Sequence, residues 1–204
     1  MRLISWNILR RIGATAEDLA ALIDARSPDL LLLQEATTDI DALPTLAGGH
    51  FWRRSMLHRI HGLGIWSPTP FPDPHVLDLP SNSDSRTQDR RFAAILRLAG
   101  VSIVNVHLSH GQALLRRQLR YVATNVTGPA VIIGDMNVVG PVRLPGFSDV
   151  GPRGTTHLAK GILPFRLDRC LTRGLVSTGS AILDRGRSDH WPILVELDRP
   201  HRQR

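Results

Sequence analysis

The segment Val131–Asn137 limits the possible folds of this chain more than any other part of it. Its apolar half, Val131–Ile133, runs straight into Gly134, and Asp135 and Asn137 then follow two residues apart. An uninterrupted apolar run indicates a strand that is buried on both faces. A buried strand that ends in an acid and an amide holds both side chains at fixed positions. The segment therefore predicts a functional site at a strand end.

The same arrangement recurs along the chain. Ser188, Asp189 and His190 lead into the apolar stretch Trp191–Val195, and the continuous apolar stretch Asp29–Glu35 ends in an acid. Polar residues also stand at the ends of other predicted strands, namely Asn7, Asn105, His107, Asp168 and, less clearly, Arg91.

Taken singly, each of these polar residues has a plain structural interpretation. Asn7 is a common turn former, and Glu35 fits the solvated start of a following helix. His107 in an apolar strand fits a satisfied core histidine. Asp168 lies between Arg166 and Arg169, which fits a surface ion pair of little energetic value.

The apolar periodicity predicts many strands and few helices. One helix begins after Thr15, with Asp18 as a capping-box partner, and ends before Pro28. A second carries Leu115, Leu119 and Val122 on its buried face. The segments Phe71–Asp89 and Gly140–Gly154 are predicted to be loops. The predicted strands are Arg2–Ile8, Asp29–Glu35, Gly62–Ser67, Phe92–Leu98, Val101–Leu108, Val131–Ile133, Phe165–Leu171 and Pro192–Leu197. Hairpin connections among them favour an α+β fold of two packed, mainly antiparallel sheets flanked by helices.

Length and composition narrow the class of protein. The chain has 204 residues, which favours one domain over residues 1–198 followed by a polar tail at 199–204, and no internal repeat is visible. The single cysteine, Cys170, excludes an internal disulfide and disfavours a cysteine-based zinc site. No apolar run has the length of a membrane span, and the chain opens directly on a strand, so we expect a cytoplasmic protein without membrane integration.

The formal net charge is +7, and the excess lies entirely after residue 100. Lys160 is the only lysine, so arginine supplies the remaining positive charge. Arginine suits bidentate phosphate contacts and a polyanionic substrate. A coding bias that replaces lysine with arginine on a solvated surface explains the composition equally well. His50, His58 and His61 lack acidic partners at ligand spacing, and we expect them to be solvated.

The order of these motifs, taken together, resembles the endonuclease/exonuclease/phosphatase superfamily, which includes deoxyribonuclease I, abasic-site endonucleases, neutral sphingomyelinases and inositol-phosphate phosphatases. The resemblance covers nearly the full chain, and Gly134–Asn137 and Ser188–His190 are its most specific elements. It implies a four-layer α/β/β/α sandwich of the deoxyribonuclease I type. It also implies a phosphoesterase that attacks phosphorus in line with an activated water and forms no covalent intermediate.

The resemblance also implies roles for individual residues. Glu35 is expected to be the main carboxylate ligand of Mg²⁺ or Mn²⁺, helped by Asn7 and Asp189. Asp135 is expected to align or deprotonate the attacking water. His190 is expected to face a non-bridging phosphate oxygen, with Asp168 fixing its tautomer and favouring its charged form. The remaining assignments are Asn137 as a holder of the phosphate or the water, His107 as an electrostatic donor or general acid near the leaving oxygen, and Arg91 as a weaker candidate for a phosphate clamp.

Two departures from the superfamily pattern bear on the substrate. The chain is short for the superfamily, so substrate-selecting loops are expected to be trimmed. His107 stands where abasic-site endonucleases carry Tyr followed by Pro and Asn, which favours the branch with deoxyribonuclease I, sphingomyelinases and phosphoinositide enzymes.

Three functions follow from the sequence. The first is a Mg²⁺-dependent phosphodiesterase, most simply a monomeric nuclease acting on DNA or RNA. The second is a hydrolase of lipid or small-molecule phosphoesters. The third, a binding module that has lost its activity, is disfavoured because every expected ligand and base is present.

Overall fold

The computed structural model describes residues 1–81 and 90–200, which form two six-stranded sheets and a separate hairpin. In spatial order, the first sheet contains β13 (Val176–Ile182), β14 (Ile193–Asp198), β1 (Arg2–Asn7), β2 (Leu30–Ala36), β4 (Gly62–Ser67) and β3 (His50–Ser55). The second contains β5 (His75–Asp78), β6 (Phe92–Leu98), β7 (Val101–His107), β8 (Ala130–Asp135), β12 (Asp168–Arg173) and β9 (Ser148–Asp149). The hairpin consists of β10 (His157–Ala159) and β11 (Leu163–Phe165).

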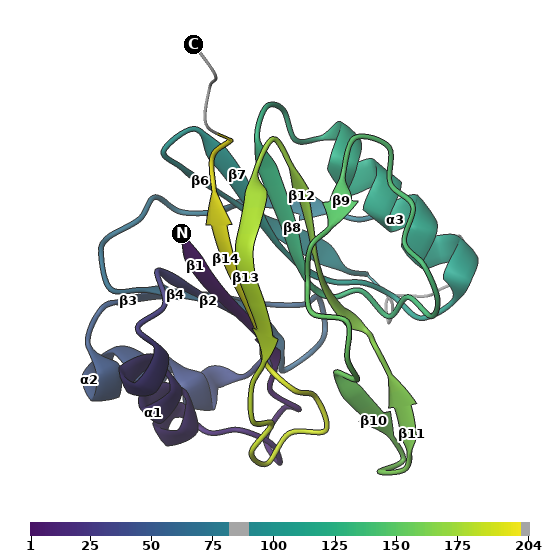
Figure 1. The fold of residues 1–204 in the computed structure, drawn as a ribbon. Coiled ribbons are helices and arrows are strands. Elements are labelled where there is room, and N and C mark those ends of the chain that lie inside the picture. Colours follow the sequence, from purple (N-terminus) through teal and green to yellow (C-terminus); the bar gives the residue numbers. More distant parts are fainter. Residues whose placement is uncertain (82–89, 201–204) are drawn as a thin grey trace.

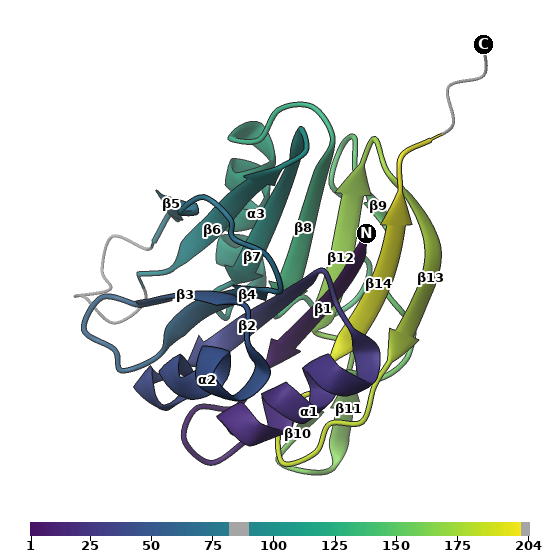
Figure 2. The same ribbon diagram turned by 90° about the vertical axis from the view of Figure 1, so that its left-hand side faces the viewer.

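Helices cover the outer face of each sheet, so the molecule has four layers (Figures 1 and 2). The helices are α1 (Ala16–Arg26), a 3₁₀ helix η1 (Thr38–Ala42), α2 (Leu43–Ala47) and α3 (Gln112–Thr124). Helices α1 and α2 pack on the first sheet, and α3 packs on the second. The predicted α+β sandwich with helices outside is therefore confirmed.

Burial on both faces explains the continuous apolar runs. In β2, Leu30 and Leu32 face the second sheet in the central core, whereas Leu31 and Leu33 pack in the cluster beneath α1. Successive residues of a strand point to opposite faces, so an unbroken leucine run serves both interfaces. The strand β8 repeats this division, with Val131 and Ile133 toward the first sheet and Ile132 toward α3.

The two sheets repeat one topology, although the sequence shows no repeat. Each contains one parallel strand pair joined through a helix, β1–α1–β2 in the first sheet and β7–α3–β8 in the second. All the remaining neighbouring pairs in both sheets are antiparallel. The four parallel strands β1, β2, β7 and β8 therefore occupy equivalent places in the two sheets. The residues at their carboxyl ends line the candidate site.

Several sequence predictions need correction at the level of elements. The segment Phe71–Asp89 is not wholly a loop, because β5 lies within it and pairs with β6, and Leu77 is buried; its residues 82–89 lie outside the described residues. The predicted strand Phe165–Leu171 is two strands, β11 and β12, separated by Arg166 and Leu167. The strands β3 and β13 were not predicted, because their residues are mostly half-buried or exposed and lack a continuous apolar run.

The capping of α1 follows the sequence prediction. The Thr15 hydroxyl accepts a hydrogen bond from the Asp18 N–H, and the Asp18 carboxylate accepts one from the Thr15 N–H at 2.8 Å. Both first-turn donors are satisfied in this way. Ser27 ends the helix in the left-handed region just before Pro28. Within residues 1–81 and 90–200, no helix has the length and apolarity needed to span a membrane.

Candidate active site

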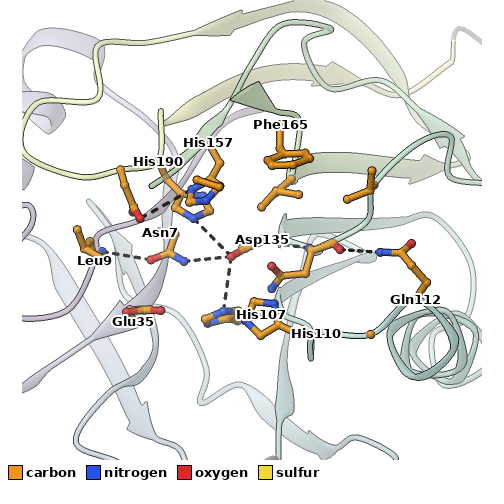
Figure 3. A pocket seen from close by; sticks show the side chains of 16 residues that line it. Asn7, Leu9, Glu35, His107, His110, Gln112, Asp135, His157, Phe165 and His190 are labelled. Atoms are coloured by element: carbon orange, nitrogen blue, oxygen red, sulfur yellow. Dashed lines mark hydrogen bonds and ion pairs between the residues drawn. The ribbon is translucent and has the colours of Figure 1, made fainter. Parts of the chain in front are cut away.

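A pocket of about 420 Å³ opens where the carboxyl ends of the parallel strands meet (Figure 3). Seven of the nine residues predicted from the sequence line it, although they come from positions 7 to 190 of the chain. They are Asn7, Glu35, His107, Asp135, Asn137, Asp189 and His190. Of the two others, Asp168 lies behind His190, and Arg91 lies outside the pocket lining.

The Asp135 carboxylate lies at the centre of the polar half of this pocket. Its Oδ2 accepts a hydrogen bond from Asn7 Nδ2 at 3.1 Å, and its Oδ1 accepts one from the Asn137 N–H at 3.0 Å. His107 Nε2 lies 3.5 Å and His190 Nε2 lies 3.8 Å from Oδ2. Burial alone would raise the pKa of Asp135, but His190, His107 and the two N–H donors outweigh it and hold the pKa below its usual value. Asp135 is therefore a charged carboxylate in a buried position.

Gly134 places Asp135 at the end of β8. Its φ of +142° lies in a region that side-chain-bearing residues rarely adopt. A Cβ atom at this position would lie 2.1 Å from the Val106 carbonyl oxygen of the neighbouring strand. The glycine therefore permits the close approach of β7 and β8 immediately before the acid.

His190 and Asp168 form a buried ion pair. His190 Nδ1 lies 2.8 Å from Asp168 Oδ2, and Asp168 is fully buried. Burial by itself lowers the pKa of His190, but the carboxylates of Asp168 and Asp135 outweigh it and raise the pKa to about 10. The imidazole is therefore protonated at neutral pH, with Nε2–H directed toward the pocket.

Two hydroxyl side chains fix the main chain that carries this pair. The Thr156 hydroxyl accepts hydrogen bonds from the N–H groups of Leu167 and Asp168 at 3.0 and 2.9 Å. On the other side, the Ser188 hydroxyl donates to the Asn7 carbonyl at 2.7 Å and accepts from the His190 N–H at 3.1 Å. The Ser188–His190 motif is thereby tied to the end of β1.

Strand register explains why three of these residues meet. His107 of β7 is paired with Asp135 of β8, and Asp135 is paired with Asp168 of β12. The three residues therefore stand in one row across adjacent strands. Burial, reinforced by the nearby positive charge of Arg91, places the pKa of His107 well below its usual value. His107 is thus a neutral imidazole beside a charged carboxylate.

Glu35 stands opposite this row, across from Asp135. Its backbone is in the left-handed region with φ of +61°, at a register shift where β2 ends. Burial is the largest cause of a raised pKa for Glu35, and the negative charge of Asp135 adds to it, whereas Arg10 opposes it. Glu35 continues β2 and does not begin a helix, since η1 starts at Thr38.

The polar half of the pocket fits a hard divalent cation. Glu35 and Asp189 offer carboxylate oxygens, and Asn7 offers an amide oxygen that accepts from the Leu9 N–H at 3.1 Å. Burying Glu35 beside the charged Asp135 raises the free energy of its ionised form, and a bound cation would lower it. The buried Oδ1 of Asp189 has no hydrogen-bond partner among the described residues. These residues therefore fit the magnesium or manganese ion expected from the sequence.

Asn137 is anchored at the opposite wall of the pocket. Its Nδ2 donates to the Leu108 carbonyl at 2.9 Å, and its own carbonyl accepts from Gln112 Nε2 at 3.2 Å. Gln112 is the first residue of α3, whose N-cap Gly111 provides no side-chain cap. The uncapped amino end of a 13-residue helix places positive potential at this wall.

Arg91 occupies a different environment from the other predicted residues. It is 6% exposed, and its guanidinium donates to the Met56 sulfur at 3.5 Å. Its charge still acts on the pKa values of Glu35, His61 and His107.

The interpretation of Asp168 as a surface ion-pair partner of Arg166 and Arg169 is wrong, because neither arginine pairs with it. Both bind Asp149, Arg166 through two bonds of 2.7 Å and Arg169 through one of 2.9 Å. Arg169 also donates to the Gly140 carbonyl at 2.7 Å, which fixes the chain that follows Asn137.

Sequence reasoning missed the buried amide pair that joins the two sheets behind the pocket. Gln34 Nε2 donates to Asn105 Oδ1 at 2.7 Å, and Asn105 Nδ2 donates to the carbonyls of Leu33 and Gly64, each at 3.0 Å. Both side chains are fully buried. They connect β7 to β2 and β4 immediately before Glu35. Their positions at the ends of predicted strands were the only indication in the sequence that these two amides are buried together.

His157 is a pocket residue that the sequence gave no reason to expect. Its ring packs on that of His190 with centroids 4.2 Å apart, and Phe165 and Gln112 also line the pocket unforeseen. The expectation for His61 was wrong, because this residue is 2% exposed. Burial, together with Arg10, lowers the pKa of His61 to about 4.

The layers and the topology define a four-layer α/β/β/α sandwich, with acid, amide and imidazole groups clustered at one end of its two sheets. The family model described as "Endonuclease/Exonuclease/phosphatase family" matches residues 4–190. The chain therefore belongs to this family, as its motifs indicated.

Solved structures share the fold across almost the whole chain. An endonuclease/exonuclease/phosphatase from Beutenbergia cavernae is 20% identical with a TM-score of 0.76, covering 98% of this chain and 71% of its own. A functionally unknown protein from Enterococcus faecalis is 17% identical with a TM-score of 0.79, covering 98% and 100%. TDP2 of D. rerio, humanized by 14 mutations, is 20% identical with a TM-score of 0.72, covering 97% and 98%. A search of the curated proteins found no match.

Proposed function

We propose that this protein is a Mg²⁺- or Mn²⁺-dependent phosphodiesterase that hydrolyses nucleic acid by in-line attack of water. The observation that carries the proposal is the buried carboxylate of Asp135, held within 4 Å of two imidazoles that differ in charge. Family membership supports the hydrolysis of phosphoesters. The reaction needs a base or aligner for water, a donor for the phosphate and a cation, and each has a candidate in the pocket.

Asp135 is the group that aligns the attacking water. Its low pKa keeps it ionised, and the donors Asn7 and Asn137 fix both of its oxygens. A fixed carboxylate accepts a hydrogen bond from water and orients its lone pair along one line toward phosphorus.

His190 is the donor for the phosphate. A protonated imidazole places a cationic N–H at a non-bridging oxygen, where negative charge grows in the transition state. Asp168 holds the ring through Nδ1 at 2.8 Å and thereby directs Nε2 to the substrate. His107 is neutral, which supports its role as an electrostatic donor near the leaving oxygen rather than as a charged general acid.

Glu35, with Asn7 and Asp189, would hold the divalent ion. When bound, the ion supplies Lewis-acid stabilisation of phosphate charge. Asn137 and the amino end of α3 would then face the phosphate from the opposite wall. Arg91 contributes through its charge on Glu35 and His107 rather than as a lining residue.

The arginine-rich second half of the chain supports a polyanionic substrate. The test is a salt titration of binding and cleavage on single- and double-stranded DNA and RNA, with Mg²⁺ and with EDTA. We expect Mg²⁺-dependent cleavage whose apparent affinity falls steeply with salt. If the protein neither binds nor cleaves any of these nucleic acids at low salt, the nuclease assignment is wrong.

One observation favours a second candidate, a hydrolase of lipid phosphoesters. The β10–β11 hairpin supplies Ala159 and Phe165 to the pocket, and its tip carries Ile162 and Leu163, which are 75% and 52% exposed. Large exposed apolar side chains beside a phosphate pocket suit a lipid surface. Liposome co-sedimentation, with a panel of phosphodiesters and phosphomonoesters, separates this candidate from the nuclease.

A further inference from the structure

His157, Asp189 and His190 form a cluster at one side of the pocket, apart from Glu35. One potential ligand atom from each residue lies within 4.8 Å of the others. Main-chain contacts hold the cluster together, because the segments that carry these residues form an antiparallel bridge between His157 and His190. The Leu158 N–H donates to the Asp189 carbonyl at 3.1 Å. The main-chain segments that carry the three donors are therefore fixed relative to one another.

Two buried atoms in this cluster lack partners. His157 Nδ1 and Asp189 Oδ1 make no hydrogen bond to any residue that the structure describes. His157 Nδ1 lies 3.9 Å from Asp189 Oδ2, which is too long for a hydrogen bond. Two ligands bound tetrahedrally to one ion at about 2.1 Å each lie about 3.4 Å apart. The two side chains therefore need to approach by only about 0.5 Å to share an ion.

His190 completes the donor set, and the Asp168 carboxylate already holds its ring at Nδ1. Its Nδ1 is engaged by Asp168, so Nε2 is the nitrogen left to bind a ligand. Histidines that bind metals commonly donate their other ring N–H to a carboxylate, which orients the ring. Asp168 provides this contact from a fully buried position.

From this geometry we infer a second metal site, which shares the Asp189 carboxylate with the proposed Mg²⁺ set, and in which His157, Asp189 and His190 bind a transition-metal ion such as Zn²⁺ and switch the enzyme off. Two imidazoles and one carboxylate favour such an ion, whereas the oxygen donors around Glu35 favour Mg²⁺. Binding forms a bond from the ion to His190 Nε2 and releases the proton of that nitrogen to solvent. His190 then has no N–H to donate to the phosphate.

The binding test uses Co²⁺ as a spectroscopic probe in the presence of millimolar Mg²⁺. We expect one Co²⁺ per chain, with visible absorption of a site that contains nitrogen ligands, and displacement by Zn²⁺. His157→Gln should weaken Co²⁺ binding at least tenfold, whereas the control His75→Gln, an exposed histidine on β5, should not change it. Glu35→Gln should retain the spectrum, since Glu35 belongs to the other site. Equal Co²⁺ affinity in the wild type and His157→Gln would overturn the proposal.

The inhibition arm rests on the proposed function. Zn²⁺ should inhibit Mg²⁺-dependent hydrolysis, and His157→Gln should require at least tenfold more Zn²⁺ for half-inhibition relative to its own uninhibited rate. The binding test and the inhibition test distinguish failure of the proposed function from failure of the second metal site. Co²⁺ binding without any phosphodiesterase activity would sink the proposed function and keep the metal site. Activity that Zn²⁺ inhibits equally in both proteins would sink the metal switch.

Discussion

His190 Nδ1 lies 2.8 Å from the Asp168 carboxylate, and this contact sets the charge of the imidazole that faces the pocket. The pairing raises the pKa of His190 to about 10 although the ring is 5% exposed. An isolated buried histidine would instead be neutral. The pair therefore converts a residue that ordinarily titrates near neutrality into a permanent cation at physiological pH.

Asp168→Asn should shift the pH dependence of catalysis. The wild type should keep activity as pH rises toward 10, because protonated His190 is the active form. Without the carboxylate, the pKa of His190 falls and activity is lost at lower pH, with about a 100-fold or larger loss of kcat/KM at pH 8. The measurement is kcat/KM between pH 6 and 10. If Asp168→Asn lost kcat/KM at the same alkaline pH as the wild type, the role assigned to Asp168 would be wrong.

The same pair links pH to stability. The pKa of His190 is higher in the folded protein than its usual value, so the stabilisation is fully present below about pH 6.5. It is lost as pH rises through about 10. The wild type should therefore lose stability between pH 7 and 10 more steeply than His190→Gln, which chemical denaturation at a series of pH values would measure.

Asp135→Asn should remove activity while sparing the fold. The amide cannot accept a proton or carry charge beside His190, so we expect kcat to fall at least 1000-fold. Circular dichroism and thermal melting should show a folded protein, because Asn has nearly the same shape. A turnover close to that of the wild type would place the chemistry elsewhere.

Glu35→Gln should separate metal binding from folding. The ionised Glu35 side chain is penalised by burial and by Asp135, so the neutral amide should raise the melting temperature of the metal-free protein. A gain of about 1 kcal/mol would correspond to about 2–4 °C for a chain of this size. Added Mg²⁺ should stabilise the wild type but not the variant, measured by thermal melting with EDTA and with Mg²⁺. Equal stabilisation of both proteins would exclude Glu35 as a ligand.

Asn105→Leu should destabilise the seam between the sheets. It removes the acceptor of Gln34 and the donor to two carbonyls, all of them buried. The cost should be about 3 kcal/mol, since buried polar groups would lose their partners. Urea denaturation measures it, and Asn125→Leu on the exposed end of α3 serves as the control. A loss below about 0.5 kcal/mol would show that the network contributes little.

Much of the fold could be predicted from local pattern. The strands β2 and β8 are recognisable because each serves two packed interfaces, and α1 because its cap and buried face agree. The strands β3 and β13 were missed because they are only partly buried, so their apolar pattern is weak. The short strand β5 lies in a proline-rich segment and is defined by its pairing with β6.

The candidate chemical groups of this protein are recognisable from its sequence alone. The acids, amides and histidines at strand ends have a fixed order, and a resemblance can be read from that order alone. Which residues each group contacts depends on the tertiary structure. His157 packs on His190, and Arg166 and Arg169 bind Asp149 rather than Asp168, because sheet pairing and main-chain bridges bring distant segments together. Local sequence specifies residue type and the kind of element, whereas proton affinity and contacts depend on burial and on neighbours far away in the chain.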